Sequence, residues 1–309
     1  MPETAKEAAD YIHPLNINGL EGRMLRVPST TTKQREILLV YGHHAMLERW
    51  WTLIETLRQY GPVTMPDLPG FGGMDSFYKI GSKPSLNAYA DYLAAFIKLR
   101  YKQKRVTIIG ISYGFVVVTR MLQRYPELAK KVDISVGIVG FMHRDDFVWS
   151  RGKRRFFRAV ARLFATRVVA LFIRYVCLNR FVIKTLDNHM SHSKQRFIEV
   201  TPEEFEANMD FEVELWQKND VRTHWLTSSQ FFTLDNTKLP IKIPVVHVES
   251  AGDHYLNNIS VEQHMRKVFS GYTKFVAETK AHTPHITANK KETGVLIPSG
   301  LRRILGRKP

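Results

Sequence analysis

The sequence predicts an α/β protein built on a doubly wound, mostly parallel sheet of the eight-stranded type, with a helical segment inserted into it. Two observations lead to this prediction. Short runs of β-branched and other apolar residues alternate with longer segments of helical periodicity, and these runs are apolar almost throughout, as in strands covered on both faces. The alternation stops over residues 141–238 and then resumes.

The first half of the chain contains four of the expected strands. The runs REILLVY, PVTMPDL, RVTIIGI and VDISVGIVG are rich in Val, Ile and Leu, which suits buried strands. Between the first two, MLERWWTLIETLRQY puts Trp50, Leu53, Ile54 and Leu57 on one helical face. We therefore expect strands at 35–41, 62–68, 105–111 and 132–140, and helices at 46–60, at 86–101 and directly after Ser112.

The second half of the chain begins without a strand pattern. Residues 141–238 contain basic, acidic and aromatic segments of helical spacing. Strand character returns in IPVVHVES (243–250) and TKFVAET (273–279), with a helix expected around SVEQHMRKVF between them. The sequence thus predicts a core of residues 1–140 and 239–309, and a helical cap, or lid, of residues 141–238.

The composition is that of an ordinary folded protein, with 44% hydrophobic and 24% charged residues in 309. The single cysteine, Cys177, cannot form an intramolecular disulfide, which fits a reducing compartment. The polar N-terminus lacks the apolar core of a secretory signal, and no charge-free run of about 18 apolar residues is present. We expect a cytoplasmic protein, with peripheral membrane association as an open alternative.

The net charge of +16 is concentrated in one segment. Between Arg151 and Ile198, twelve lysines and arginines stand against one acidic residue, Asp187. A net charge of this size bears on which partners a protein binds and not on its fold. Because no nucleic-acid-binding motif accompanies it, we expect no nucleic acid partner.

The motif GISYG (110–114) lies between a predicted buried strand and a predicted helix. Glycines on either side of Ser112 allow a sharp turn that larger side chains would obstruct. The N-terminus of the following helix supplies free N–H groups and partial positive charge near the serine oxygen. This context favours Ser112 as a nucleophile, and the alternative is a small residue in a tight turn.

A serine hydroxyl is a weak nucleophile that needs a base, and the base needs an orienting acid. Asp253 follows the strand expected at 243–250, and His282 follows the strand expected at 273–279. Both positions lie where strands end, and open α/β sheets carry their sites at the carboxyl ends of their strands. We expect Asp253 and His282 to be the partners of Ser112.

With these residues the chain resembles an α/β-hydrolase with a helical cap, over about residues 20–140 and 240–295. The resemblance rests on LLVYGHHAMLERW, MPDLPGFGGM, IIGISYGFVV and KAHTPHITANKKE. It implies that Ser112 is the nucleophile, His282 the base and Asp253 the acid.

The same resemblance implies an oxyanion hole and no cofactor. The backbone N–H groups of His43 and Tyr113 would donate to the oxyanion. One departure is visible, because the family usually has His-Gly where this chain has Tyr41-Gly42. The donor is a backbone group, so activity can survive the replacement, but it puts the local geometry in question.

Other residues compete with the two partners of Ser112. His285 is the alternative base, although the family pattern favours His282, which precedes Thr-Pro. Glu249 and the pair Asp145–Asp146 are alternatives to Asp253 as the acid. We expect Glu249 to face away from the site because it lies within the strand.

Three further polar residues lie at or directly after the ends of two predicted strands. We expect His43 and His44 to line the pocket rather than to bind a metal, because no Cys/His spacing resembles a metal site. Asp67, in MPDLPG, is expected to fix its loop.

The basic segment RRFFRAVARLFATRVVALFIRYVCLNRFVIK contains an apolar stripe at helical spacing. The stripe consists of Phe157, Val160, Phe164, Val168, Leu171, Tyr175, Leu178 and Val182. We expect it to cover the substrate pocket while Arg155, Arg158 and Arg162 face solvent. Two further uses of the basic surface stay open: binding to an anionic membrane surface, and docking of an acidic carrier protein that presents an acyl chain.

The sequence therefore predicts a serine hydrolase that cleaves an ester or related acyl bond of a small apolar substrate. The residues expected to bind the substrate are His44, Phe156, Phe164, Trp216 and Trp225. Thioester and C–C hydrolysis would use the same three catalytic residues. A non-catalytic, hydrolase-like binding protein is the alternative from another class, motivated by Tyr41.

Overall fold

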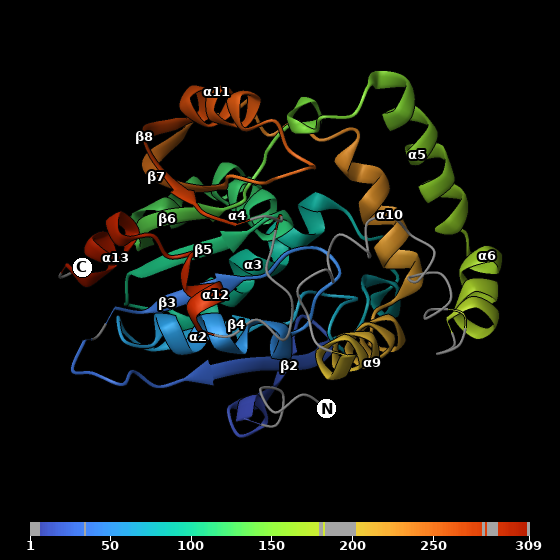
Figure 1. The fold of residues 1–309 in the computed structure, drawn as a ribbon, viewed down its shortest axis with the longest axis horizontal. Coiled ribbons are helices and arrows are strands. Elements are labelled where there is room, and N and C mark those ends of the chain that lie inside the picture. Colours follow the sequence, from blue (N-terminus) through green and yellow to red (C-terminus); the bar gives the residue numbers. More distant parts are fainter. Residues whose placement is uncertain are drawn as a thin grey trace.

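The computed structural model describes residues 7–33, 35–178, 182, 202–279, 282 and 290–307. Within these residues an eight-stranded sheet has the order β1-β2-β4-β3-β5-β6-β7-β8 (Figure 1). The strands are β1 (Ile12–Ile17), β2 (Leu20–Val27), β3 (Ile37–Val40), β4 (Val63–Pro66), β5 (Val106–Ile111), β6 (Val132–Ile138), β7 (Ile241–Ser250) and β8 (Phe269–Ala277).

The sheet is mostly parallel, which confirms the predicted fold class. All pairs from β4 to β8 are parallel, whereas β1 pairs with β2 and β2 with β4 in antiparallel fashion. Each of the six predicted strands is present, with ends that differ by a few residues. The β1–β2 hairpin was not predicted. Its turn, Asn18-Gly19, has φ of 52° and 77°, the positive values that an Asn-Gly hairpin turn adopts.

Helices follow most of the strands. They are α2 (Trp51–Leu57), α3 (Leu86–Arg100), α4 (Tyr113–Arg124), α5 (Arg151–Phe164), α6 (Arg167–Phe172), α9 (Pro202–Lys218), α10 (Val221–Phe231), α11 (Asn258–Val268), α12 (Lys290–Gly294) and α13 (Ser299–Gly306). A short 3-10 helix, Arg144–Asp146, follows β6, and a π-helical turn, Ile173–Cys177, follows α6. None of the helices in the described ranges is long and apolar enough to cross a membrane.

The sheet is covered on both faces. A Cβ placed on Gly110 of β5 would meet Phe115 of α4, so α4 packs on the face toward which Gly110 points. Thr107, three residues earlier, points to the opposite face. There its hydroxyl accepts a hydrogen bond from Arg35, whose guanidinium also donates to the carbonyl of Leu305 in α13. Helices α4 and α13 therefore lie on opposite faces, as a doubly wound sheet requires.

Helices α5, α6, α9 and α10 all fall in residues 141–238, and no strand of the sheet falls in the described part of that range. Helix α10 packs against α5 and α6. In Figure 1, α5 and α6 form the outermost edge of the molecule on this side, with α10 between them and the sheet. Helix α9 also lies inside α6 in this view, and its Phe211 and Leu215 pack on Met46 of the loop after β3.

Candidate active site

Ser112 stands in a strained turn between β5 and α4. Its φ of 49° and ψ of −117° are rare for a residue with a side chain. The two neighbouring glycines are sterically required. A Cβ on Gly110 would lie 2.5 Å from the Cα of Phe115, and one on Gly114 would lie 2.1 Å from the carbonyl oxygen of Val40. The sequence GISYG therefore enforces this turn and exposes the serine hydroxyl at the carboxyl edge of the sheet.

The structure brings Ser112, His282 and Asp253 together in one hydrogen-bonded series. Ser112 Oγ donates to His282 Nε2 over 2.9 Å, and His282 Nδ1 donates to Asp253 Oδ2 over 2.6 Å. Asp253 follows β7, and His282 follows β8. The three side chains come from the ends of strands that are distant in sequence, so only the folded sheet assembles them.

Asp253 is held as an anion. Burial alone would raise its pKa, but the hydrogen bond and charge of His282 and two backbone donors outweigh burial, so the pKa lies below its ordinary value. The donors are the N–H groups of Tyr255 and Leu256, at 2.9 and 3.1 Å from Oδ1. The ring of Tyr255 also packs edge-on against His282, with centroids 5.7 Å apart. This environment fixes the carboxylate and the ring that it orients.

The alternative acids have other partners. Asp145 pairs with Arg154 at 2.6 Å, and Asp146 pairs with His264 at 2.5 Å. Glu249 lies in β7, 3.7 Å from the amine of Lys274. The alternative base, His285, lies outside the described residues.

The loop after β3 lies directly against the nucleophile. A Cβ on Gly42 would lie 3.3 Å from both Ser112 Cβ and the carbonyl oxygen of Ile111. Tyr113 is the first residue of α4, so its N–H has no partner within the helix. The N–H groups of His43 and Tyr113 donate to no acceptor in the described part of the chain.

Tyr41, the departure from the family pattern, is built into a buried network. Its hydroxyl donates to Asp67 Oδ1 over 2.8 Å and accepts from the backbone N–H of Leu68 over 2.7 Å. Arg23 bridges Asp67 at 3.0 Å and Glu48 at 2.7 Å. Burial raises the pKa of Asp67 to about 8 and that of the Tyr41 hydroxyl well above its ordinary value. The network ties the loop after β3 to the loop after β4, in the structural role expected for Asp67.

We call the strained turn at Ser112, between β5 and α4, the elbow. Three histidines form a cluster beside it. His43 Nε2 contacts Thr227 Oγ1 at 2.8 Å, and His44 Nδ1 contacts His224 Nδ1 at 3.1 Å and Asn219 at 3.0 Å. Burial lowers the pKa of His43 to about 4 and the pKa values of His44 and His224 well below 6.5. The three imidazoles are therefore neutral at pH 7. No group of three or more potential metal ligands is found among the described side chains.

Most of the predicted substrate-binding residues surround this cluster. Trp216 packs on His44 with ring centroids 4.1 Å apart, and Trp225 packs on His224 at 5.1 Å. Phe164 meets Trp225 edge-on at 4.9 Å. His224 itself was not predicted, because a histidine within a helix carries no motif and only the packing of α10 brings it beside the loop after β3.

Phe156 and the predicted apolar stripe depart from expectation. Phe156 is 64% exposed and does not face the cluster. The stripe is interrupted between α5 and α6, so its two halves differ: Phe164 turns toward α10, whereas Val168 and Tyr175 are 78% and 79% exposed. In the second half of the stripe, Val168 and Tyr175 therefore face solvent, whereas Leu178 packs with Trp216 against Met209 and Val213.

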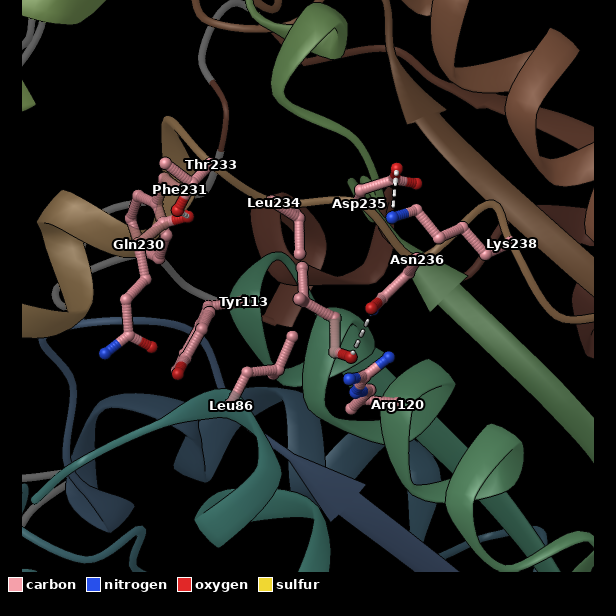
Figure 2. Close-up of a pocket in the computed structure, with 11 residues that line it drawn as sticks. Leu86, Tyr113, Arg120, Gln230, Phe231, Thr233, Leu234, Asp235, Asn236 and Lys238 are labelled. Carbon is pink, nitrogen blue, oxygen red and sulfur yellow. Dashed lines mark hydrogen bonds and ion pairs between the residues drawn. The ribbon is translucent and has the colours of Figure 1, made fainter.

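A pocket of about 280 Å³ flanks the elbow along α4 (Figure 2). Tyr113 and Phe231 line it, with ring centroids 5.2 Å apart, and Asn236 donates from its amide to the carbonyl of Val116 over 3.1 Å. Among the described residues, its lining includes Tyr113 but not Ser112. The pocket thus lies beside the turn rather than in front of the serine hydroxyl.

Comparison with known proteins places this geometry in a family. The family model described as the alpha/beta hydrolase fold matches residues 37–288, most of the chain. The chain belongs to the alpha/beta hydrolase fold family. The human protein ABHD8 is 31% identical over 110 residues, which are 35% of this chain and 25% of that protein, so the match spans a quarter of the relative's length.

Solved structures agree on the fold of this alpha/beta hydrolase. A putative lipase from Acinetobacter baumannii AYE has a TM-score of 0.67 at 14% identity, over 97% of this chain and 94% of its own. An esterase from Thermogutta terrifontis has a TM-score of 0.64 at 15% identity, over 96% and 98%. At these identities the likeness establishes the fold alone.

Proposed function

We propose that this alpha/beta hydrolase is a serine hydrolase that cleaves an ester or related acyl bond of an apolar substrate. The observation that carries the proposal is the series Ser112 Oγ, His282 and Asp253, joined at 2.9 and 2.6 Å. In this series the serine has a base within hydrogen-bond reach and the base has a carboxylate on its other nitrogen, the arrangement that serine nucleophiles need.

The reaction follows from the geometry. Ser112 Oγ attacks the substrate carbonyl carbon while His282 Nε2 takes the hydroxyl proton, and the same proton passes to the departing alcohol. Water then attacks the acyl-enzyme, giving one proton to His282, which returns it to Ser112 as the acid leaves. Asp253 holds the ring and stabilises its positive charge. The N–H groups of His43 and Tyr113 would stabilise the oxyanion, and one such donor contributes about 10²–10³-fold in rate.

The side chains near the elbow favour an apolar substrate. Phe231 packs within 5.2 Å of Tyr113 and 5.0 Å of His43, and the rings of Trp216 and Trp225 continue this aromatic wall. The nearby histidines are neutral and so do not attract an anionic acyl group. An apolar or aromatic acyl chain is the ligand that such a lining suits.

The proposal is tested with p-nitrophenyl esters from acetate to palmitate and with a fluorophosphonate probe. Wild-type protein should hydrolyse at least one ester and be labelled, and Ser112→Ala should lose both properties, with kcat reduced by about 10⁴–10⁶-fold. Ser82→Ala, at an exposed serine, is the matched control and should behave as wild type. A wild-type protein that is neither labelled nor active on esters would contradict the proposal. If the protein hydrolyses only a thioester, the acyl-enzyme mechanism would stand, but the proposed substrate class would change from esters to thioesters.

A further inference from the structure

Helix α6 and the turn after it present an apolar face to solvent. Five large apolar side chains recur at the spacing of one helical face, which normally packs against a core. They are Val168 (78% exposed), Leu171 (46%), Phe172 (58%), Tyr175 (79%) and Val176 (51%). On α5, Phe156 and Leu163 are seven residues apart and also exposed, at 64% and 56%. Soluble monomers seldom leave so much contiguous apolar surface uncovered without using it.

Helix α5 also borders a hollow lined mainly by arginine. The hollow measures about 420 Å³, and five guanidinium groups and one carboxylate surround it. The arginines are Arg144, Arg151, Arg154, Arg155 and Arg158. The carboxylate, Asp145, is already paired with Arg154 at 2.6 Å. Within the described ranges, Arg151, Arg155 and Arg158 form no hydrogen bond or ion pair, so they are available to an anion.

The two features lie on one side of the molecule. Helices α5 and α6 contact each other and α10, and together they form the outer edge seen in Figure 1. Arg151, Arg155, Arg158 and Arg162 recur along one strip of α5. About a third of a turn away, a second strip carries Phe156 and Leu163, and only the small residues Gly152 and Ala159 lie between the two strips. A helix with an apolar strip bordered by arginines is suited to the boundary between lipid headgroups and acyl chains. We call the exposed side chains of α5, α6 and residues 173–176 the outer cap surface.

We propose that the outer cap surface docks this protein on an anionic lipid bilayer. Guanidinium groups in the hollow would bind headgroup phosphates, for which their planar donors are well matched. The apolar side chains of α6 would enter the headgroup–acyl boundary. Charge selects this occupant over a second copy of the chain, because two molecules of net charge +16 would bring arginine against arginine. The proposal goes beyond the proposed hydrolase activity and does not require it.

Co-sedimentation with vesicles tests the docking. We expect the full-length protein to bind vesicles of phosphatidylcholine mixed with phosphatidylglycerol, and to bind pure phosphatidylcholine much more weakly. The double variant Arg155→Gln/Arg158→Gln should lower the partition coefficient on anionic vesicles by about 30-fold, given the attraction of each basic residue to an anionic surface. Arg105→Gln/Arg303→Gln removes the same charge from exposed sites elsewhere and should have a far smaller effect.

A second pair of variants tests the apolar part. Val168→Ser/Phe172→Ser should weaken binding to anionic vesicles by about tenfold or more, because it removes apolar surface that would leave water. Leu99→Ser/Ile259→Ser is matched to it in exposure (60% and 72%) and should leave binding unchanged. Because none of these residues touches the candidate active site, hydrolysis of a soluble short-chain ester should be the same in all four variants. That readout separates loss of docking from failure of the proposed function.

Four outcomes would overturn the proposal. They are absence of binding to anionic vesicles, equal binding to neutral vesicles, and equal losses in the test and control variants. The fourth is occupancy of the surface by something else. Light scattering that reveals a dimer dissolved by Val168→Ser/Phe172→Ser would assign the surface to a second copy. Binding to an acidic acyl carrier protein without binding to vesicles would assign it to a protein partner.

Discussion

Gly114→Ala is the sharpest test of how the elbow is built. The added Cβ would lie 2.1 Å from the carbonyl oxygen of Val40 and 2.5 Å from that of Tyr41. Ordinary contact between heavy atoms needs about 3.5 Å, so α4 and the end of β3 must separate by more than about 1 Å. The loop that carries His43 begins at this point. The substitution should therefore move one predicted oxyanion donor away from Ser112.

A misplacement of this size in a catalytic group typically costs about 10²-fold in rate, and overpacking costs about 1–3 kcal/mol of stability. The assay is kcat/KM on a soluble p-nitrophenyl ester together with the free energy of unfolding in urea. Two further glycines make a graded series. A Cβ on Gly42 would meet atoms at 3.3 Å, and one on Gly152, in α5, would meet nothing within 4 Å.

The reasoning predicts that activity falls in the order of contact distance. Gly152→Ala should match wild type in activity and should not lose stability, because the added Cβ meets no atom within 4 Å and alanine suits a helix better than glycine. Gly42→Ala should be intermediate, which keeps the series informative if Gly114→Ala fails to fold. Activity of Gly114→Ala within about threefold of wild type would refute the argument, since the elbow would then tolerate the displacement.

Three further outcomes are expected. Asp253→Asn should lower kcat by about 10⁴-fold with a native circular dichroism spectrum, and a loss below about tenfold would remove Asp253 from the acid role. Tyr41→Phe leaves two buried partners of the hydroxyl unpaired, so urea unfolding should report a loss of about 2–3 kcal/mol, and no measurable loss would contradict the network. Burial lowers the pKa of His43 to about 4 from 6.5, so its contribution to stability is complete above pH 6.5 and is lost as the pH falls toward 4. The stability difference between wild type and His43→Gln should therefore change between pH 6.5 and 4 by up to about 1.4 kcal/mol per unit, and a constant difference would show that His43 does not titrate there.

The parallel strands could be predicted because burial on both faces leaves a nearly uninterrupted apolar run. All six residues of β5 are buried, and the corresponding sequence RVTIIGI is an almost uninterrupted apolar run. The first two strands lie at the edge of the sheet, and β1 buries only one of its six residues fully, so its sequence lacks such a run. Asn18-Gly19 was the signal available there, because this pair favours the hairpin turn that the structure contains.

The predicted cap, residues 141–238, shows what helical periodicity in a sequence cannot predict. Apolar residues at helical spacing look the same in a sequence whether they face a core or solvent. The sequence therefore could not show that Val168 and Tyr175 point outward. The stripe is also interrupted where α5 ends at Phe164 and α6 begins at Arg167. Contacts between segments distant in sequence, such as His224 against His44, depend on the packing of α10 and carry no local signal.

The surroundings of four histidines suggest why one of them would be the base. His43, His44, His224 and His282 all lie near the elbow, and burial lowers the pKa of the first three, whose hydrogen-bond partners in the described residues are neutral. A base in acyl transfer must carry a positive charge while the tetrahedral intermediate exists. His282 has a carboxylate 2.6 Å from Nδ1 to stabilise that charge, and no carboxylate of the described part of the chain bonds to the other three. Under the proposed mechanism, the carboxylate of Asp253 would therefore select His282 as the base.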